Sequence, residues 1–556
     1  MPAYPKNYPF YNWVPKPIGI IILFMFFLPI LTVGGTYSAS GTEMMSGLGI
    51  ISEHIQFANF ATSIGMAAFC PFLYRLVCIR REKMMCIVGF SLMYIFSYIC
   101  AKTDSIFLLA LCSLFMGFLR MVLMMVNLFT LIKYAGNVEA TEKITPGNEP
   151  TTGEGWDKLD IERSAAQPAI YLFFMVLGQL GTSLTAWLTY EYEWQYVYYF
   201  MMGLLLLCIL ITFVTMPYHK YATRRFPINL KQFGNASIFC ITLTCITYVL
   251  TYGKVLDWMS SPKICIYIVL APMLIAFFVW YQYHAERPYV NLAPLYQPKA
   301  IVGYLYMMLV MFFSTSTTLL TNFLTTILRV DSSHTYSLYV WLLPGYLLGA
   351  FICFWWFRWQ RWRFRFLIAG GMACFAFFFG YLYFFLSPDT TYEMLYLPIF
   401  IRGLGMLTLI IAFALFVVED LNPKFLLMNA FFLITFRSVL APIMATSFYS
   451  NTLYRLEQKY MHSLVETVTM ADPLAASRYG ESFGAALAGG HSYGDAVQMA
   501  TYSLNTTLQQ QALLLSLKEM LGVLFVVALV IAVISRFIPF HKTLRVTFAR
   551  TGDDMV

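Results

Sequence analysis

The chain has 556 residues, of which 59% are hydrophobic and only 12% charged, and its net charge is +8. Because soluble domains carry about 25% charged residues, this composition excludes a typical soluble protein and indicates a membrane protein. The eleven cysteines show neither C-x-x-C pairs nor a paired spacing with histidine, so we expect no disulfides and no metal site.

Fourteen apolar stretches, each of about the length that crosses a bilayer as a helix, follow one another along the chain. They span residues 17–39, 50–74, 84–101, 106–132, 167–189, 196–216, 235–253, 263–283, 300–327, 336–357, 364–386, 394–418, 425–449 and 514–537. The apolar core of the first is too long for a signal peptide. We therefore predict an all-α polytopic membrane protein with fourteen transmembrane helices.

Lysine and arginine are distributed unevenly between the two sides of these helices. With the amino terminus in the cytoplasm, 25 of the 36 fall in inside loops, 8 in outside loops and 3 within helices. This bias predicts a multi-pass protein of the cytoplasmic (inner) membrane with both termini cytoplasmic. It also accounts for the net charge, so no nucleic-acid partner is expected.

Two segments interrupt the pattern of short loops. Residues 135–167 combine acidic residues with glycine and proline, and we expect a flexible cytoplasmic insert there. Residues 451–511 are polar and are expected outside the membrane. They form either a short surface hairpin or a docking site for a partner protein, and the sequence leaves both interpretations open.

A repeat is visible in the basic loops. The loop after the second helix, "RLVCIRREK", contributes Arg75, Arg80, Arg81 and Lys83, and "RWQRWRFR" follows the tenth helix. Such clusters can serve as topology anchors, but their matching positions favour two related six-helix halves. We expect halves at 1–216 and 300–556, joined by two inserted helices within 217–299, a 6 + 2 + 6 arrangement.

The central stretch "LTYGKVLDWMSSPKICIYIVLAPMLIAFFVWYQYHAERPYVNLAPLY" resembles the fourteen-helix drug:proton antiporter branch of the major facilitator superfamily. The similar positions are Gly253, Asp257, Trp258, Glu286, Pro288, Val290 and Leu292. In the fifth helix, the family motif Gly-Pro-x-x-Gly-Gly falls on Gly181, Thr182, Thr185 and Ala186, followed by Trp194. The small residues still allow close helix packing, whereas the loss of proline removes the expected kink.

The resemblance implies a major facilitator fold without cofactors and a secondary transporter working by alternating access. Its implied activity is export of amphipathic small molecules or drugs in exchange for protons. Relatives in double-membraned bacteria often work with a periplasmic adaptor and an outer-membrane channel, which could dock on residues 451–511. The alternatives are a proton-linked or facilitative uptake carrier and a non-transporting membrane scaffold.

Three arginines lie deep within the predicted helices: Arg120, Arg402 and Arg437. An isolated arginine at mid-membrane costs from about 2.5 to more than 10 kcal/mol, so each needs a wet cavity or protein partners. Bonds to backbone carbonyls that hold helices together are the alternative. Since no acid lies equally deep, Glu53 and His54 at the outer end of the second helix are the candidates for proton coupling.

Polar residues recur on one face of the ninth helix, at Ser314, Thr318 and Asn322. Asn127, two turns from Arg120, and Gln179 add further amides. Serine and threonine in such helices often bond their own backbone. Together with the aromatic residues, however, the amides predict a cavity for amphipathic organic molecules, and the arginines favour anionic or zwitterionic ones.

Motifs of common enzymes are absent from the sequence: it has no G-x-x-x-x-G-K-[ST], no H-E-x-x-H and no G-x-S-x-G. ATP-driven pumping and familiar hydrolysis therefore lack their residues. We expect a protein that is not an enzyme and whose partners are a small-molecule substrate, protons and the lipid bilayer.

Overall fold

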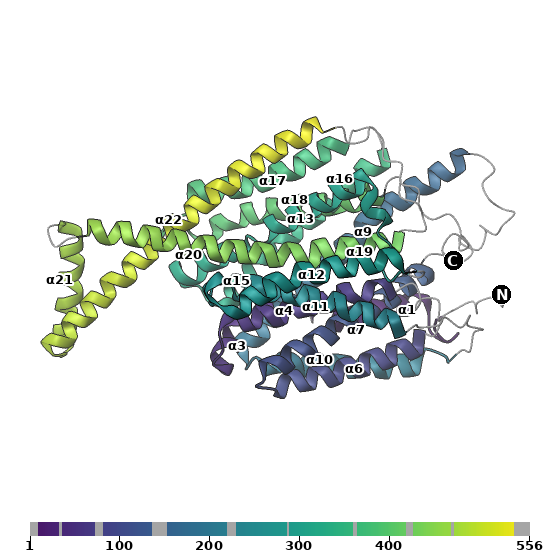
Figure 1. The fold of residues 1–556 in the computed structure, drawn as a ribbon, viewed down its shortest axis with the longest axis horizontal. Coiled ribbons are helices and arrows are strands. Elements are labelled where there is room, and N and C mark those ends of the chain that lie inside the picture. The colour runs from purple at the N-terminus through teal and green to yellow at the C-terminus, as the bar shows by residue number, and fades with distance from the viewer. Residues whose placement is uncertain are drawn as a thin grey trace.

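A computed structural model describes residues 9–32, 36–72, 82–135, 153–218, 230–285, 288–359, 364–418, 426–468 and 472–538. Every structural statement below concerns these residues, in which the regular elements are all helices (Figure 1). The basic residues Arg75, Arg80 and Arg81, and residues 136–152 of the acidic insert, lie outside the described part of the chain.

The helices follow the order that the apolar stretches predict. The first half contains α1 (Lys16–Thr32), α2 (Thr36–Ala39), α3 (Gly41–Leu48), α4 (Ser52–Phe69), η1 (Cys70–Phe72), α6 (Glu82–Lys102), α7 (Ile106–Ala135), α9 (Gly153–Glu191) and α10 (Gln195–Thr215). Next come α11 (Leu230–Tyr252), η2 (Trp258–Ser260), α12 (Pro262–His284) and η3 (Ala293–Tyr296).

The second half is more often interrupted. It contains α13 (Pro298–Thr315), α14 (Thr317–Asn322), the π-helix η4 (Phe323–Ile327), α15 (Ser332–Leu338), η5 (Tyr339–Trp341), α16 (Leu342–Trp359), α17 (Phe364–Phe385), η6 (Tyr392–Leu395), α18 (Tyr396–Val418), α19 (Leu426–Ile434), the π-helix η8 (Thr435–Leu440), α20 (Ala441–Thr467), α21 (Pro473–Ala488) and α22 (Tyr493–Phe537).

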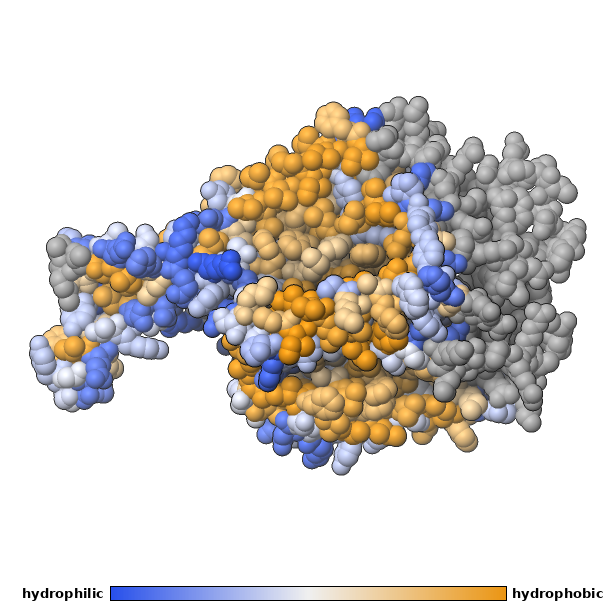
Figure 2. Space-filling model, viewed as in Figure 1, coloured by the Kyte–Doolittle hydropathy of each residue, from blue (hydrophilic) through white to orange (hydrophobic). Residues whose placement is uncertain are grey.

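Twelve described helices are long and apolar enough to cross a membrane, and α1 is a shorter apolar helix. Large apolar side chains such as Phe107 and Phe213 are exposed on the outside of the bundle. Figure 2 shows a broad apolar belt bordered by polar surface, as expected for a surface that meets lipid. The chain is thus a multi-pass membrane protein, while the count of fourteen crossings stays a prediction.

The two halves repeat the same packing. In the first, α4 packs on α7 and α6 on α10; in the second, α16 packs on α18 and α17 on α22. Glycines allow α7 to approach α4 closely and α18 to approach α16 closely. A Cβ on Gly117 would meet the backbone of Thr62, and one on Gly403 would meet the backbone of Leu342. One apolar core lies within the second half. The other is built mainly from the first half but also includes second-half residues such as Tyr304 and Phe431.

Of the two central helices, α11 packs against α4 and α20, and α12 packs against α11. The turn after α11 explains part of the central motif. A Cβ on Gly253 would lie 2.8 Å from the Trp258 ring, and Trp258 Nε1 donates a hydrogen bond to Asn451 Oδ1 at 3.3 Å. Asp257 and Trp258 adopt φ values of 52° and 49° to make this turn.

The polar segment 451–511 forms a helical arm that projects from the bundle (Figure 1). It consists of the end of α20, all of α21 and the beginning of α22, and Asp472 and Ser492 cap the last two helices. The last helix was expected to begin at 514, but α22 begins at Tyr493. Hydropathy marks only the apolar part of a helix that continues into water.

The acidic insert also differs from the expectation. Residues 135–167 were predicted as flexible, yet α9 begins at Gly153 and runs without a break to Glu191. The prediction was therefore wrong for 153–167. Extending an existing helix by one residue avoids the cost of nucleating a new one, and "EGWDKLDIERSAAQ" contains many good helix formers.

Candidate substrate cavity

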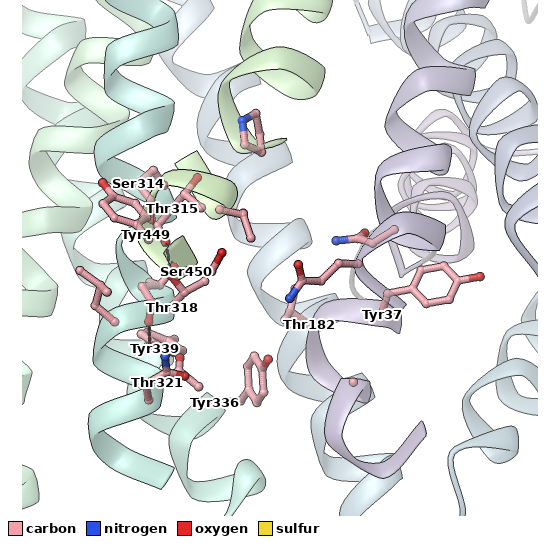
Figure 3. A pocket seen from close by; sticks show the side chains of 18 of the residues that line it. Tyr37, Thr182, Ser314, Thr315, Thr318, Thr321, Tyr336, Tyr339, Tyr449 and Ser450 are labelled. Atoms are coloured by element: carbon pink, nitrogen blue, oxygen red, sulfur yellow. Dashed lines mark hydrogen bonds between the residues drawn. The ribbon is translucent and has the colours of Figure 1, made fainter. Parts of the chain in front are cut away.

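A cavity of about 590 Å³ lies between the two halves, within the range of small-molecule sites. Its first-half lining comes from α2 to α4 and α9, and its second-half lining from α13 to α16, α18 and α20. Figure 3 shows Thr182 facing hydroxyl side chains across this space. The polar and aromatic lining includes Tyr37, Thr42, Ser52, Gln56, Asn59, Phe60, Gln179, Thr182, Ser314, Thr318, Thr321, Asn322, Tyr336, Tyr339, Tyr346, Arg402, Thr446, Tyr449 and Ser450.

The cavity lies toward the end of the bundle that carries α3 and the arm (Figure 1). Its lining includes residues from α3 and from the first turns of α4, α16 and α18. Beyond it, the two halves meet where η1 packs on α19 and α4 packs on η8. The Tyr289 hydroxyl also donates to the backbone oxygen of Ala68 next to this contact. The cavity is therefore lined by both halves and bounded on one side by their contact.

Arg402 is the one charged residue among the described residues that line the cavity. It is only 2% exposed, and its Nη2 donates to Ser314 O at 2.5 Å. Its guanidinium lies 5.2 Å from the centre of the Phe378 ring. Nε and Nη1 are buried without a hydrogen-bond partner, so this cation is only partly satisfied.

A sulfur atom accepts hydrogen bonds beside this arginine. The Ser314 hydroxyl donates to Met406 Sδ at 3.4 Å, and the Tyr346 hydroxyl donates to the same atom at 3.7 Å. Thioether sulfur is a weak acceptor. Two hydroxyl donors beside Arg402 therefore point at an atom that satisfies them poorly.

Amide side chains supply most of the remaining polarity. Gln56 and Asn59 come from α4, Gln179 from α9 and Asn322 from the end of α14. Within the described part of the chain, none of these four side chains makes a hydrogen bond to protein, in contrast to Thr182 and Thr318, which bond their own helix backbone. The amides are thus free to bind a molecule or water in the cavity.

The structure brings together six of the predicted site residues, with Gln179 and Thr182 on one side and Ser314, Thr318, Asn322 and Arg402 on the other. Arg120, Asn127 and Arg437 do not line this cavity. Arg120 Nε and Asn127 Nδ2 are buried without a partner, while Cys86 Sγ donates to Asn127 Oδ1 at 3.7 Å. Arg437 lies on η8, near Tyr171 of α9.

The coupling candidates lie next to the cavity rather than in it. His54 Nδ1 forms a 2.6 Å hydrogen bond with the Tyr252 hydroxyl at the end of α11. Glu53 Oε2 accepts a hydrogen bond of 3.0 Å from Ser52, a lining residue. Lys83 donates to the Phe213 and Met216 carbonyl oxygens, so it ties α6 to the end of α10.

The positions of the antiporter motif face different neighbours along α9. Gly181 packs on Thr32 of α1, with 3.6 Å available to an added Cβ. Thr185 and Ala186 are buried, and the Thr185 hydroxyl donates to Thr182 O at 2.8 Å. Only Thr182 of the four reaches the cavity.

Solved structures share this fold, whereas no protein-family model and no curated protein matches the sequence. A mutant of the nucleoside transporter NupG aligns with a TM-score of 0.53 and 12% identity, covering 94% of this chain and 100% of that one. A POT family transporter in complex with a thioalcohol conjugated peptide aligns with a TM-score of 0.50 and 14% identity, covering 96% and 98%. The chain shares the fold of these transporters, and membership of the major facilitator superfamily stays a prediction. The fourteen-helix branch stays a prediction.

The sequence analysis did not identify the cavity tyrosines or two of the amides, Gln56 and Asn59. Tyr336, Tyr339 and Tyr346 recur at spacings of three and seven residues, which places them on one helical face. On α4, Ser52, Gln56 and Asn59 follow the same rule, at spacings of four and three. Both patterns are visible in the sequence and could have predicted this surface.

Proposed function

We propose that the chain is a secondary transporter that carries a small organic molecule across the membrane by alternating access. The observation that carries this proposal is the cavity between two halves of repeated packing, bounded on one side by their contact. Rocking the halves about such a site would expose it to each side in turn. A scaffold needs neither the cavity nor its free amides.

The cavity chemistry supports amphipathic substrates. Five tyrosines offer aromatic faces and hydroxyl groups, the amides offer donors and acceptors, and Arg402 offers positive charge. An anionic or zwitterionic molecule suits this lining better than a cation.

Export of amphipathic molecules or drugs by proton exchange is the direction that the sequence resemblance favours. The proposed coupling groups are Glu53 and His54, because Glu53 bonds the lining residue Ser52 and His54 bonds Tyr252 of α11. Uptake, proton-linked or facilitative, is the second candidate. It is favoured by the antiporter motif, in which threonine stands where the family has proline.

The orientation and the partners are also proposals. The positive-inside pattern supports a cytoplasmic-membrane protein with both termini inside, which would place the arm on the outer side. The arm exposes Leu474, Tyr493 and Tyr502. These apolar side chains support a docking site for a periplasmic adaptor, through which export could continue to an outer-membrane channel.

Transport can be tested in cells that express the wild-type chain or Arg402→Ala at matched membrane levels. The cells are loaded with a panel of anionic, neutral and cationic dyes, and efflux is followed with and without an uncoupler. We expect uncoupler-sensitive efflux, and the mutant should lose efflux of the anionic dyes. Net accumulation would favour uptake, and movement of no compound in either direction would contradict the proposal.

A further inference from the structure

Arg402 and its neighbours form a cluster of hydrogen-bond donors that lacks an acceptor of matching strength. The arginine is 2% exposed. Its Nη2 donates to the Ser314 carbonyl oxygen and, at 3.5 Å, to Ser314 Oγ, while its other two nitrogen atoms are unpaired. Each buried donor left unpaired is costly, and a buried cation without an anionic partner is costlier still. No carboxylate lines the cavity among the described residues.

The two neighbouring hydroxyl groups point in a common direction. Ser314 and Tyr346 belong to different helices, α13 and α16, yet both donate to Met406 Sδ. Methionine is flexible and its sulfur is a poor acceptor. The sulfur therefore occupies the place to which hydroxyl groups from two helices converge beside the arginine.

We propose that this cluster is an anion subsite, in which the charged end of an organic anion replaces the Met406 thioether. This inference rests on the proposed transport function and specifies its substrate class: an aromatic carboxylate or an equivalent oxyanion. The anion receives charge-assisted bonds from Arg402, whose planar fork suits two oxygen atoms. Ser314 and Tyr346 supply further hydroxyl donors.

The aromatic part of the substrate has a place in the same cavity. Tyr336 and Tyr339 lie along the lining on the α15 and η5 side (Figure 3). Phe60 of α4 also lines the cavity. Aromatic rings bind well between such faces. A cavity of about 590 Å³ accommodates a molecule with one or two rings.

The alternative is that Arg402 only stabilises the packing of α18 on α13, through its hydrogen bond to the Ser314 carbonyl oxygen. Such a structural role affects the stability of the protein, whereas an anion subsite affects the preference between ligands that differ in charge alone. The two roles are therefore separable by measuring binding with matched probes.

The probes are dansylglycine, which is anionic, its neutral amide dansylglycinamide, and the cationic dansyl-ethylenediamine. Binding is measured by fluorescence polarisation with the full chain in nanodiscs, after subtraction of empty nanodiscs. We expect the wild type to bind the anion at least about tenfold more tightly than the amide, as one additional charge-assisted contact provides. The cation should bind more weakly than the amide.

Three variants separate the possible roles. Arg402→Gln should remove the preference for the anion while leaving the affinity for the amide within about twofold, and Arg402→Lys should restore part of the preference. Arg437→Gln is the matched control, a half-buried intramembrane arginine outside this cavity, and should keep the full preference. Tyr346→Phe should lower the affinity for the anion more than that for the amide.

Equal binding of the three probes, or a preference that survives in Arg402→Gln, would overturn the anion subsite. Failure of the wild type to bind dansylglycine would overturn it as well. None of these results removes the proposed transport function, which the efflux assay tests separately with uncharged and cationic dyes. If Arg402→Gln does not fold, the test rests on the ratio of anion affinity to amide affinity in Arg402→Lys and in Tyr346→Phe. A ratio equal to that of the wild type in both variants would overturn the anion subsite.

Discussion

Replacement of Gly117 by alanine should separate α7 from α4. A Cβ at this position would lie 1.9 Å from the carbonyl oxygen of Thr62 and 2.7 Å from its carbonyl carbon. Since Cβ atoms do not approach other atoms within 3.0 Å, the helices must move apart by about 1 Å. The obstacle is backbone, so no side-chain rotation relieves it.

Overpacking of this kind costs about 1–3 kcal/mol, and sometimes more. We expect Gly117→Ala to fall at the upper end of that range. Gly403→Ala at the equivalent crossing of the second half should cost less, because its Cβ would lie 2.7 Å from the nearest atom, Leu342 O. Gly203→Ala is the control, since nothing lies within 4 Å of its Cβ. Alanine should gain about 0.5–1 kcal/mol there through helix propensity.

Thermal unfolding of the three variants, purified in one detergent and followed by fluorescence-detected size exclusion, checks this order. The predicted order of stability, from lowest to highest, is Gly117→Ala, Gly403→Ala, wild type and Gly203→Ala. A Gly117→Ala variant as stable as Gly203→Ala would show that the close crossing of α4 and α7 does not exist.

Three further predictions concern coupling, the inserted helices and the arm. Glu53→Gln combined with His54→Ala should leave probe binding intact but abolish pH-driven transport in proteoliposomes, and an unchanged response to the pH gradient would exclude the pair. Trp258→Phe and Asn451→Ala should each destabilise the protein by about 1 kcal/mol through loss of their hydrogen bond; the double mutant should cost no more than the larger single change, and full additivity would contradict the contact. Tyr502→Ser on the exposed arm should reduce cross-linking to an adaptor in cells without changing unfolding or probe binding, and unchanged cross-linking would place docking elsewhere.

The positions of the membrane helices could be predicted because a run of about 20 apolar residues is a strong pattern. The arm could not be predicted in the same way. The first turns of α22 are polar and exposed around Tyr493 and Tyr502, so they lack the pattern of a membrane helix. The π-helices around Phe323 and Thr435 likewise leave no mark in hydropathy, since an extra residue per turn does not change composition.

The arginines show why the sequence alone does not predict which residues line the cavity. Arg120 and Arg402 look alike in the sequence, each a single charge in an apolar run. Only the rotation of each helix against its neighbours decides that Arg402 lines the cavity and Arg120 does not. Helical periodicity predicted that Ser314, Thr318 and Asn322 share one face. It did not predict which surface of the first half lies across the cavity from that face.

The central claim is that two halves rock about the cavity, and a pair of distances measured by electron paramagnetic resonance tests it most directly. On a background without the eleven native cysteines, one spin-label pair replaces Thr42 and Thr318 across the cavity, and a second replaces Met84 and Trp359 toward the other end. We predict that dansylglycine changes both distances in opposite directions, one shortening as the other lengthens. Two distances that stay fixed with and without dansylglycine, in a preparation that binds it, would contradict alternating access.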